Sequence, residues 1–437
     1  MNDKVIARAP SDIGVSYYDG GRTYDSSRNE MIYPLLEDFA KKGRWLGVYP
    51  QITHSWRCGF PWTGPQFIRF RCREFARKGL SNVIGYAVPG NAYSEFNVAA
   101  MAEWSWNADG RTAEEFCRAW ATRMGVCEPD QFVKWAIPAG EAGWSLAETN
   151  LFLSAIYNPS LSLGHVPFDH RFAKAGVAAP GNLSKALSQA RESLRVAEKV
   201  ENREMILESK CTLAGLEAFE ALNEVHPLLS SASLDSEQKA RLSSALDRLD
   251  ECALLLRSAV IEWGEIRTER GPLPGRLFDT AYALLRTSDI YRAKAAALGV
   301  ADSHPELRPK KIGEWSEADF AGEKKTTLMI DVSDLVPPEG GRCNVRFEYI
   351  DSMNGTDIAG FLAHIGEGAG ALRIKSPDWL FRVSRWERDH ELRVEIPKRD
   401  AGTPVKLEIV LSGPGSEVPA DRRSCSGAVS LRRLTTD

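Results

Sequence analysis

The chain has 437 residues, which is too long for one small hydrophobic core and predicts two or three domains. Its net charge is −4 and no long run carries one sign, which argues against nucleic-acid and membrane-surface partners because both require a basic patch. No apolar run approaches the length that crosses a membrane. These properties predict a soluble protein.

The eight cysteines are spread along the chain, with no CxxC pair and no histidine at ligand spacing. This scatter favours reduced, buried thiols over a disulfide framework, and it predicts no structural zinc and no other cofactor. The opening "MNDKVIARAP" lacks the charged and apolar regions of a signal peptide. We therefore expect a cytoplasmic protein from the chain as written, or a secreted or periplasmic one if the natural start lies upstream.

Residues 1–138 alternate apolar runs with helical patterns. Three runs predict strands, and each is followed by an amphipathic segment: "SDIGVSYYDGG", "RWLGVYPQITHSW" and "SNVIGYAVPGN". In the segment after the first run, Met31, Leu35 and Phe39 are spaced as on one face of a helix, and Gly43 marks the end of that helix. Strands that alternate with helices are typical of βαβ units in a parallel sheet, and we count three such units.

Two further regions follow with different periods. Residues 139–308 predict a helical bundle domain of four to six helices, one of which begins at a capping box of Asp235 and Gln238. From 309 to 437 the period becomes two, and the apolar positions include Cys343, Val345, Phe347 and Tyr349, then Leu392, Val394 and Ile396, then Val405, Leu407 and Ile409. Short strands between Gly, Pro and Asp turns predict a β-sandwich. The predicted fold class is therefore multidomain, with α/β, all-α and all-β parts.

The stretch "IGYAVPGNAYSEFNVAAMAEWSWNADGRTAEEFCRAW" is similar to the end of the barrel in glycoside hydrolase families 20 and 84, which include β-N-acetylhexosaminidases, and in related bacterial proteins. In family 84 the last barrel strand enters a loop with an Asn-Pro pair, whereas here Pro89 precedes Asn91. Family 20 barrels close with a helix that contains a stretch like Ala102-Glu103-Trp104. The order of elements in residues 11–124 thus resembles the closing strands and helices of a (β/α)8 barrel.

The resemblance implies a partial (β/α)8-type barrel made of the last three βα units, followed by a helical domain and an accessory sandwich. It also implies hydrolysis of β-linked N-acetylhexosamine with the substrate acetamide as nucleophile. In these families an adjacent pair of catalytic carboxylates follows the fourth strand, a position that here would precede Met1. Asp19 is the one strand-end carboxylate that could serve as an acid, and the alternatives are that it binds a sugar hydroxyl or is structural. Glu103 lies well into its helix, away from the strand end, so we expect it to be structural.

Polar and aromatic residues gather at the three predicted strand ends. Planar rings suit the apolar faces of sugars, and polar side chains suit the sugar hydroxyls, so this mixture favours a sugar-facing surface. The candidate substrate-binding residues are Tyr18, Arg22, His54, Trp56, Asn91 and Tyr93. The alternative is that they are ordinary loop residues of an α/β domain.

Three interpretations of the short barrel stay open. A complete barrel needs about 250 residues, and three strands alone leave two free sheet edges. The chain is either the carboxyl-terminal part of a longer enzyme, or pairs with a second copy or another chain that supplies strands, or folds as an independent open α/β domain. The functions under comparison are a glycoside hydrolase, a non-catalytic glycan-binding protein, and an interaction protein that uses its helices. Carbohydrate is the expected partner of the first two.

Overall fold

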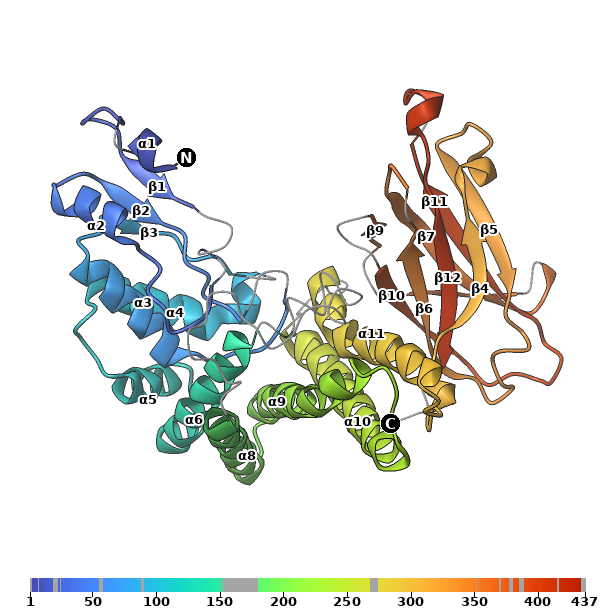
Figure 1. Cartoon of the computed structure of the whole chain (residues 1–437), viewed down its shortest axis with the longest axis horizontal. Coiled ribbons are helices and arrows are strands. Elements are labelled where there is room, and N and C mark those ends of the chain that lie inside the picture. The colour runs from blue at the N-terminus through green and yellow to red at the C-terminus, as the bar shows by residue number, and fades with distance from the viewer. Residues whose placement is uncertain are drawn as a thin grey trace. The chain divides into compact units, whose positions relative to one another are not determined.

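A computed structural model of the chain shows a mixed α/β protein with several sheets (Figure 1). It describes residues 2–6, 8–18, 23, 25–54, 58–87, 90–149, 151, 180–267, 274–350, 352–368, 371–376, 380–384, 389–414 and 416–433. The chain divides into two compact units, which are Met1–Glu269 with Asp279–Ala301, and Arg270–Phe278 with Asp302–Asp437. No sheet formed by the described residues closes into a barrel.

The first unit contains a three-stranded parallel sheet in the order β1-β2-β3. Its strands are β1 (Val15–Tyr17), β2 (Leu46–Val48) and β3 (Asn82–Val83). The elements around it are α1 (Asn2–Ile6), α2 (Pro34–Lys41), α3 (Pro65–Arg77), η1 (Asn91–Ser94) and α4 (Glu95–Trp106). The predicted alternation of strands with helices and the predicted parallel pairing are confirmed for these residues.

Proline and glycine set the limits of the two connecting helices. α2 and α3 begin at Pro34 and Pro65, because the fixed φ and missing N–H of proline suit the first helical position. Each helix ends before a glycine with φ of +75°, at Gly43 and Gly79, where other residues would be strained. The helices cover one face of the sheet with a shared core of Ile6, Tyr17, Met31, Ile32, Leu36, Phe39, Ala40, Leu46, Val48 and Phe75.

Further helices of the first unit are α5 (Ala113–Arg123), α6 (Pro129–Glu148), α8 (Pro180–Val200), α9 (Arg203–Leu229), α10 (Ser236–Arg267) and α11 (Gly275–Ala297). Residues 275–278 at the start of α11 fall in the second unit. The predicted capping box is present, since Asp235 and Gln238 exchange hydrogen bonds of 2.8 and 3.0 Å between side chain and backbone.

The predicted boundary between residues 138 and 139 lies inside α6, which continues through Pro138 without a break. Apolar residues of α3, α4, α6, α8 and α9 belong to one core cluster, which includes Phe67, Trp104, Trp135, Val196 and Met205. The segments predicted as separate α/β and helical domains therefore share a core. This shared core is the physical reason that they form one compact unit.

The second unit contains two antiparallel sheets, in the orders β10-β6-β12-β4 and β5-β11-β7-β8, with β9 paired to β7. The strands are β4 (Lys310–Trp315), β5 (Lys325–Asp331), β6 (Gly341–Tyr349), β7 (Thr356–Ile365), β8 (Leu372–Lys375), β9 (Arg382–Val383), β10 (Asp389–Ile396), β11 (Val405–Ser412) and β12 (Gly427–Arg433). Single 3₁₀ turns are η3 (Pro305–Leu307), η4 (Glu317–Phe320) and η6 (Ala420–Arg422).

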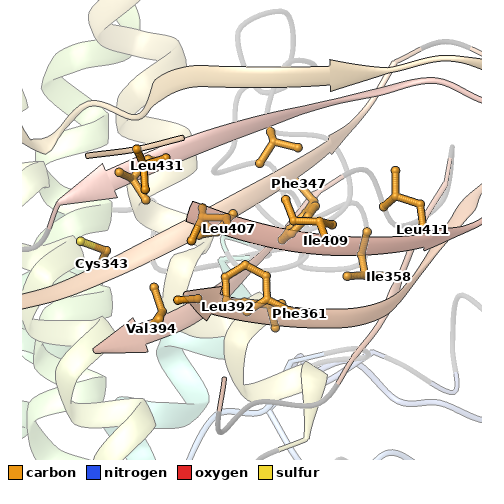
Figure 2. Close-up of a cluster of buried hydrophobic side chains, with 14 of the residues drawn as sticks. Cys343, Phe347, Ile358, Phe361, Leu392, Val394, Leu407, Ile409, Leu411 and Leu431 are labelled. Carbon is orange, nitrogen blue, oxygen red and sulfur yellow. The ribbon is translucent and has the colours of Figure 1, made fainter. Parts of the chain in front are cut away.

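Side chains from both antiparallel sheets meet in one apolar cluster (Figure 2). Phe347 and Leu392 come from the first of these sheets, and Phe361 and Ile409 come from the second. The predicted period of two is confirmed at these strands, because alternate residues of a strand point to the same face. The intervening polar positions are not all solvated, since Asn344 is fully buried.

Candidate functional site

The carboxyl ends of the three parallel strands place three tyrosines along one edge of the sheet. Tyr18 directly follows β1 and Tyr49 directly follows β2. Pairing continues beyond β3, because Gln51 and Tyr86 form a parallel bridge and the Ile52 N–H donates to the Tyr86 carbonyl at 3.1 Å. Parallel strands end on the same side of a sheet, which is where ligands of α/β folds bind.

Tyr18, Tyr49 and Tyr86 form the tyrosine edge of this sheet. The rings of Tyr18 and Tyr49 meet edge to face, with centroids 6.3 Å apart. Tyr18 exposes 55% of its surface, while Tyr49 and Tyr86 are half-buried. Ser16 of β1 lies opposite Gly47 of β2. Two residues further along each strand are Tyr18 and Tyr49, so these two residues are neighbours on the same face of the sheet. The sheet therefore presents aromatic surface to solvent at its carboxyl edge.

Buried polar residues lie directly behind the tyrosine edge. The Gln51 side-chain amide donates to Ser26 Oγ at 3.3 Å and to the Thr53 carbonyl at 3.1 Å, and Ser26 Oγ donates to the His54 carbonyl at 2.8 Å. Gln51 Oε1 and Thr53 Oγ1 are buried and have no hydrogen-bond partner among the residues described. A buried acceptor or hydroxyl without a partner costs about 1–3 kcal/mol, so the polar atoms of this loop lower the stability of the fold.

His54 lies beneath this surface, whereas the sequence pattern placed it against a sugar. Only 2% of it is exposed, and its ring contacts Phe60 and Trp62 at centroid distances of 4.6 and 5.9 Å. Burial lowers the pKa of the imidazole to about 3, because charge is costly in an apolar environment. His54 is therefore neutral at physiological pH and packs inside the loop that follows β2.

Two helices hold that loop in place. Asn97 of α4 donates to the carbonyls of Ile52 and Trp62 at 2.7 and 2.8 Å and accepts from the Gly64 N–H at 3.0 Å. Glu208 of α9 accepts hydrogen bonds from the Thr63 N–H and hydroxyl. Burial raises the pKa of the Glu208 carboxyl to about 7.

The segment after β1 is held by a buried ionic cluster on α3. Arg71 donates to the carbonyls of Asp25 and Ser27 at 2.8 and 3.2 Å and pairs with Glu74 at 3.2 Å. Glu74 also accepts from the Ile32 N–H at 2.7 Å. The backbone carbonyls of this loop have no partners in a helix or sheet, so the hydrogen bonds from these side chains satisfy them and fix the path of the loop.

A second clamp on the same segment comes from α6. The Trp144 indole N–H donates to the Ser26 carbonyl at 2.7 Å. Arg28 lies 4.2 Å from the centroid of the Trp144 ring and pairs with Glu148 and with Glu141. Burial raises the pKa of the Glu148 carboxyl, against the lowering effect of Arg28. Side chains of α3, α4, α6 and α9 thus anchor the loops that follow β1 and β2.

The other predicted residues occupy different surroundings. Tyr93 lies in η1 with its ring 5.7 Å from that of Trp263 in α10, so it packs against the helices of the first unit. Asn91 begins η1. Asp19, Arg22 and Trp56 lie outside the described residues. Glu103 pairs with Arg111 at 2.9 Å, and its structural role stays a prediction.

Some residues of the tyrosine edge and its support were not predicted from the sequence. Tyr49 and Tyr86 each stand at the end of an apolar run, in "GVYP" and "IGYAVP", and this position is the signal that identifies them. Asn97 appears in the sequence as a lone polar residue on the apolar side of a helix. Glu208 carries no comparable signal, because its partner Thr63 is far away in the chain.

The described residues contain no group of three or more His, Cys, Asp or Glu side chains that could hold a metal ion. Among the same residues no helix is long and apolar enough to cross a membrane. No protein-family model matches the chain, and no curated protein sequence matches it.

Proposed function

We propose that this chain is a glycoside hydrolase-like protein that binds carbohydrate at the tyrosine edge. In this proposal the parallel sheet with its helices corresponds to the last three βα units of a (β/α)8-type barrel, and the second unit is an accessory β-sandwich. The observation that carries the proposal is the meeting of Tyr18 and Tyr49 at the ends of neighbouring parallel strands, with Tyr86 on the next strand.

The chemistry of the edge supports a sugar as the ligand. Pyranose rings have flat C–H faces that pack against aromatic rings, and their hydroxyls need hydrogen-bond partners around the rim. The tyrosine edge offers rings and phenolic hydroxyls together. The edge belongs to a sheet whose loops are tied to helices, which keeps the ring positions fixed for binding.

Hydrolysis is the second candidate activity, and the residue of the sequence that supports it is Asp19. Asp19 directly follows Tyr18 in the sequence. In the families that the chain resembles, an acid residue works with the acetamide of the substrate, and β-linked N-acetylhexosamine is therefore the proposed substrate. Asp25 is less suited as the acid, because it is buried and accepts the Ser27 N–H at 2.8 Å.

The binding proposal is tested by calorimetric titration with short chitooligosaccharides. We expect saturable binding by the wild-type chain and a roughly tenfold loss of affinity for Tyr49→Ala, which corresponds to about 1.4 kcal/mol. Trp106→Ala is the matched control, since Trp106 is an aromatic residue of the same unit with 92% of its surface exposed. Equal loss in both variants, or no binding by the folded wild-type chain, contradicts the proposal.

Hydrolysis is tested separately with an aryl β-N-acetylglucosaminide. Turnover that Asp19→Asn abolishes, while sugar affinity is kept, supports a hydrolase. Binding without turnover by the same preparation selects the non-catalytic glycan-binding function.

A further inference from the structure

A groove on the first unit runs along α3, and no residue of the tyrosine edge lines it. α3 forms one wall, and the turn between α4 and α5 forms the other together with the first turn of α5. The volume of the groove is about 810 Å³, which lies within the range of sites that hold a small organic ligand. All of its lining residues lie between Glu30 and Glu114, so it belongs to one compact unit.

Three arginines of α3 line this groove at intervals of four residues. They are Arg69, Arg73 and Arg77. Residues four apart lie one above another on the same side of a helix, so the three side chains form a row along the groove. Two of them have carboxylate partners that also line the groove. Arg73 pairs with Asp109 at 3.2 Å, and Arg77 pairs with Glu30.

Arg69 is the exception in this row. Its side chain is half-buried, and it forms no ion pair or hydrogen bond with the residues that the structure describes. Its Nε atom is buried. A guanidinium carries its charge at every physiological pH, so burying part of it without a counter-charge costs free energy. An anion bound in the groove supplies the missing counter-charge.

The acidic residues of the groove have other partners. Two of the four are the partners of Arg73 and Arg77 named above. The third, Glu74, is buried and pairs with Arg71 and Lys78. The fourth, Glu114, is exposed in the first turn of α5, where the helix dipole stabilises a negative charge. Within the described part of the chain, Arg69 is therefore the one charged side chain of the lining whose charge is not compensated.

Part of the groove is apolar. The apolar lining residues are Phe70, Ala76, Ala108 and Ala113. Phe70 directly follows Arg69 in α3, and its ring lies against the Trp144 ring with centroids 5.6 Å apart. This contact holds the Phe70 ring in place beside the arginine row. An apolar surface next to one uncompensated guanidinium suits a ligand with a carbon body and an anionic group.

We propose that this groove is a binding site for an organic anion. The Arg69 guanidinium binds the anionic group, because its planar fork matches the oxygens of a carboxylate or a phosphate. The apolar surface around Phe70 packs against the carbon body of the ligand. Arg73 and Arg77 keep their own carboxylate partners. The site is separate from the tyrosine edge, and the proposal does not rest on sugar binding there.

The test is calorimetric titration of the full chain with benzoate and with phenyl phosphate. Both probes have an aromatic body, and they differ in the anionic group, so their relative affinities identify the group that the site prefers. We expect saturable binding of at least one probe, with a Kd below about 1 mM. Benzyl alcohol has the same ring without a charge and should bind at least about tenfold more weakly, because it cannot pair with the guanidinium. Equal affinity for the alcohol and the anions contradicts the proposal.

Arg69→Gln should lower the affinity for the preferred probe by about tenfold or more, because the charge-assisted hydrogen bonds of the guanidinium are lost. Arg118→Gln is the matched control, since Arg118 is an arginine of α5 that pairs with Asp130 and does not line the groove. It should leave the affinity unchanged. Arg69 has no partner within the described residues, so Arg69→Gln should not lower the midpoint of denaturant unfolding. This result separates loss of the site from loss of the fold.

Two further variants test the shape and the sign of the site. Ala76 is an exposed residue of the groove wall, so Ala76→Phe should fill the groove and weaken binding while Arg69 is kept. Glu114→Gln should bind the anions at least as tightly as the wild type, because it removes a negative charge from the groove. A folded wild-type chain that binds neither probe overturns the proposal, and so does an Arg69→Gln variant that binds like the wild type. Loss of binding in Glu114→Gln would mean that the ligand is cationic. None of these results depends on the titration with chitooligosaccharides.

Discussion

The parallel sheet of the first unit and the antiparallel sheets of the second are stabilised in different ways. The antiparallel strands reach ten residues and send alternate side chains into a shared apolar cluster. The parallel strands have two or three residues, and the loops beyond them are held by buried polar side chains such as Arg71, Asn97 and Glu208. A short parallel sheet therefore depends on helices that reach its loops, whereas a long antiparallel sheet depends on its own alternation.

The largest expected effect is in the antiparallel sheets. Phe347→Ala removes a fully buried ring from the shared cluster and should lower the free energy of unfolding by about 4 kcal/mol. Denaturant titration measures the change. Met329→Ala, on an exposed position of β5, serves as the control and should change it by less than about 0.5 kcal/mol. A small effect of Phe347→Ala would mean that the cluster does not stabilise this unit.

In the first unit, the next largest loss of stability is expected from a buried ion pair beside the parallel sheet. Arg71→Met removes the donor to the carbonyls of Asp25 and Ser27 and one of the partners of Glu74, and the loss of these buried hydrogen bonds should cost about 3 kcal/mol. Arg73→Met is the control on the same helix, because Arg73 pairs with Asp109 in solvent and such pairs contribute less than about 1 kcal/mol. Equal free energies of unfolding for the two variants in denaturant titration would show that burial of the Arg71 cluster does not stabilise the unit.

Glu208 should make the stability of the first unit depend on pH between the unfolded and the folded pKa of its carboxyl. Burial raises the pKa of its carboxyl from 4.5 to about 7, so between these values the folded chain holds a proton that the unfolded chain has released. Stability is then greatest below the unfolded pKa and falls as pH rises toward the folded pKa. The loss should approach about 3 kcal/mol, since one pKa unit is about 1.4 kcal/mol.

The measurement is denaturant unfolding of Glu208→Gln and the wild-type chain from about pH 4 to about pH 8. The variant should lose most of this slope because glutamine does not titrate. Glu217→Gln, on the same helix and paired with Arg191 near the surface, should keep it. Identical slopes in the wild type and the Glu208→Gln variant would place the pH dependence elsewhere.

The smallest effect should be equal in both units. Thr112 and Ser316 each close a capping box, with Glu115 and Asp319. Thr112→Ala and Ser316→Ala should each cost about 1 kcal/mol, because a cap is a local contact that does not depend on the surrounding sheet. Thermal unfolding compares the two variants with Thr122→Ala, whose hydroxyl donates within α5. A much larger loss at only one cap would show that the two regions differ in local contacts too.

Local patterns in the sequence predict a large part of the elements. Val345 and Phe347 alternate with polar residues and lie in a strand, and Asp235 and Gln238 start a helix as their spacing indicates. Both signals act over a few residues, so the chain carries them without its tertiary contacts. The boundary at 138 fails for the opposite reason, because the shared core that joins the α/β and helical segments comes from residues far apart in the chain.

The candidate site divides in the same way. Tyr18 is found by its place after an apolar run, and Tyr49 and Tyr86 carry the same signal. His54 follows the second strand as well, yet it lies buried against Phe60 and Trp62. A strand-end position indicates that a residue is near the edge of the sheet, but it does not say which side chains cover it.

The sequence by itself therefore determined the strand and helix periods, the caps, and the aromatic residues at the strand ends, since each depends on neighbours within one or two turns of chain. The tertiary structure alone decided that Glu208 of α9 and Asn97 of α4 hold the loop after β2, and that the Trp45 ring packs over Gly14 and Gly47. These contacts join segments that are distant in the chain. Their energies depend on burial and on precise approach, and neither quantity is encoded in local spacing.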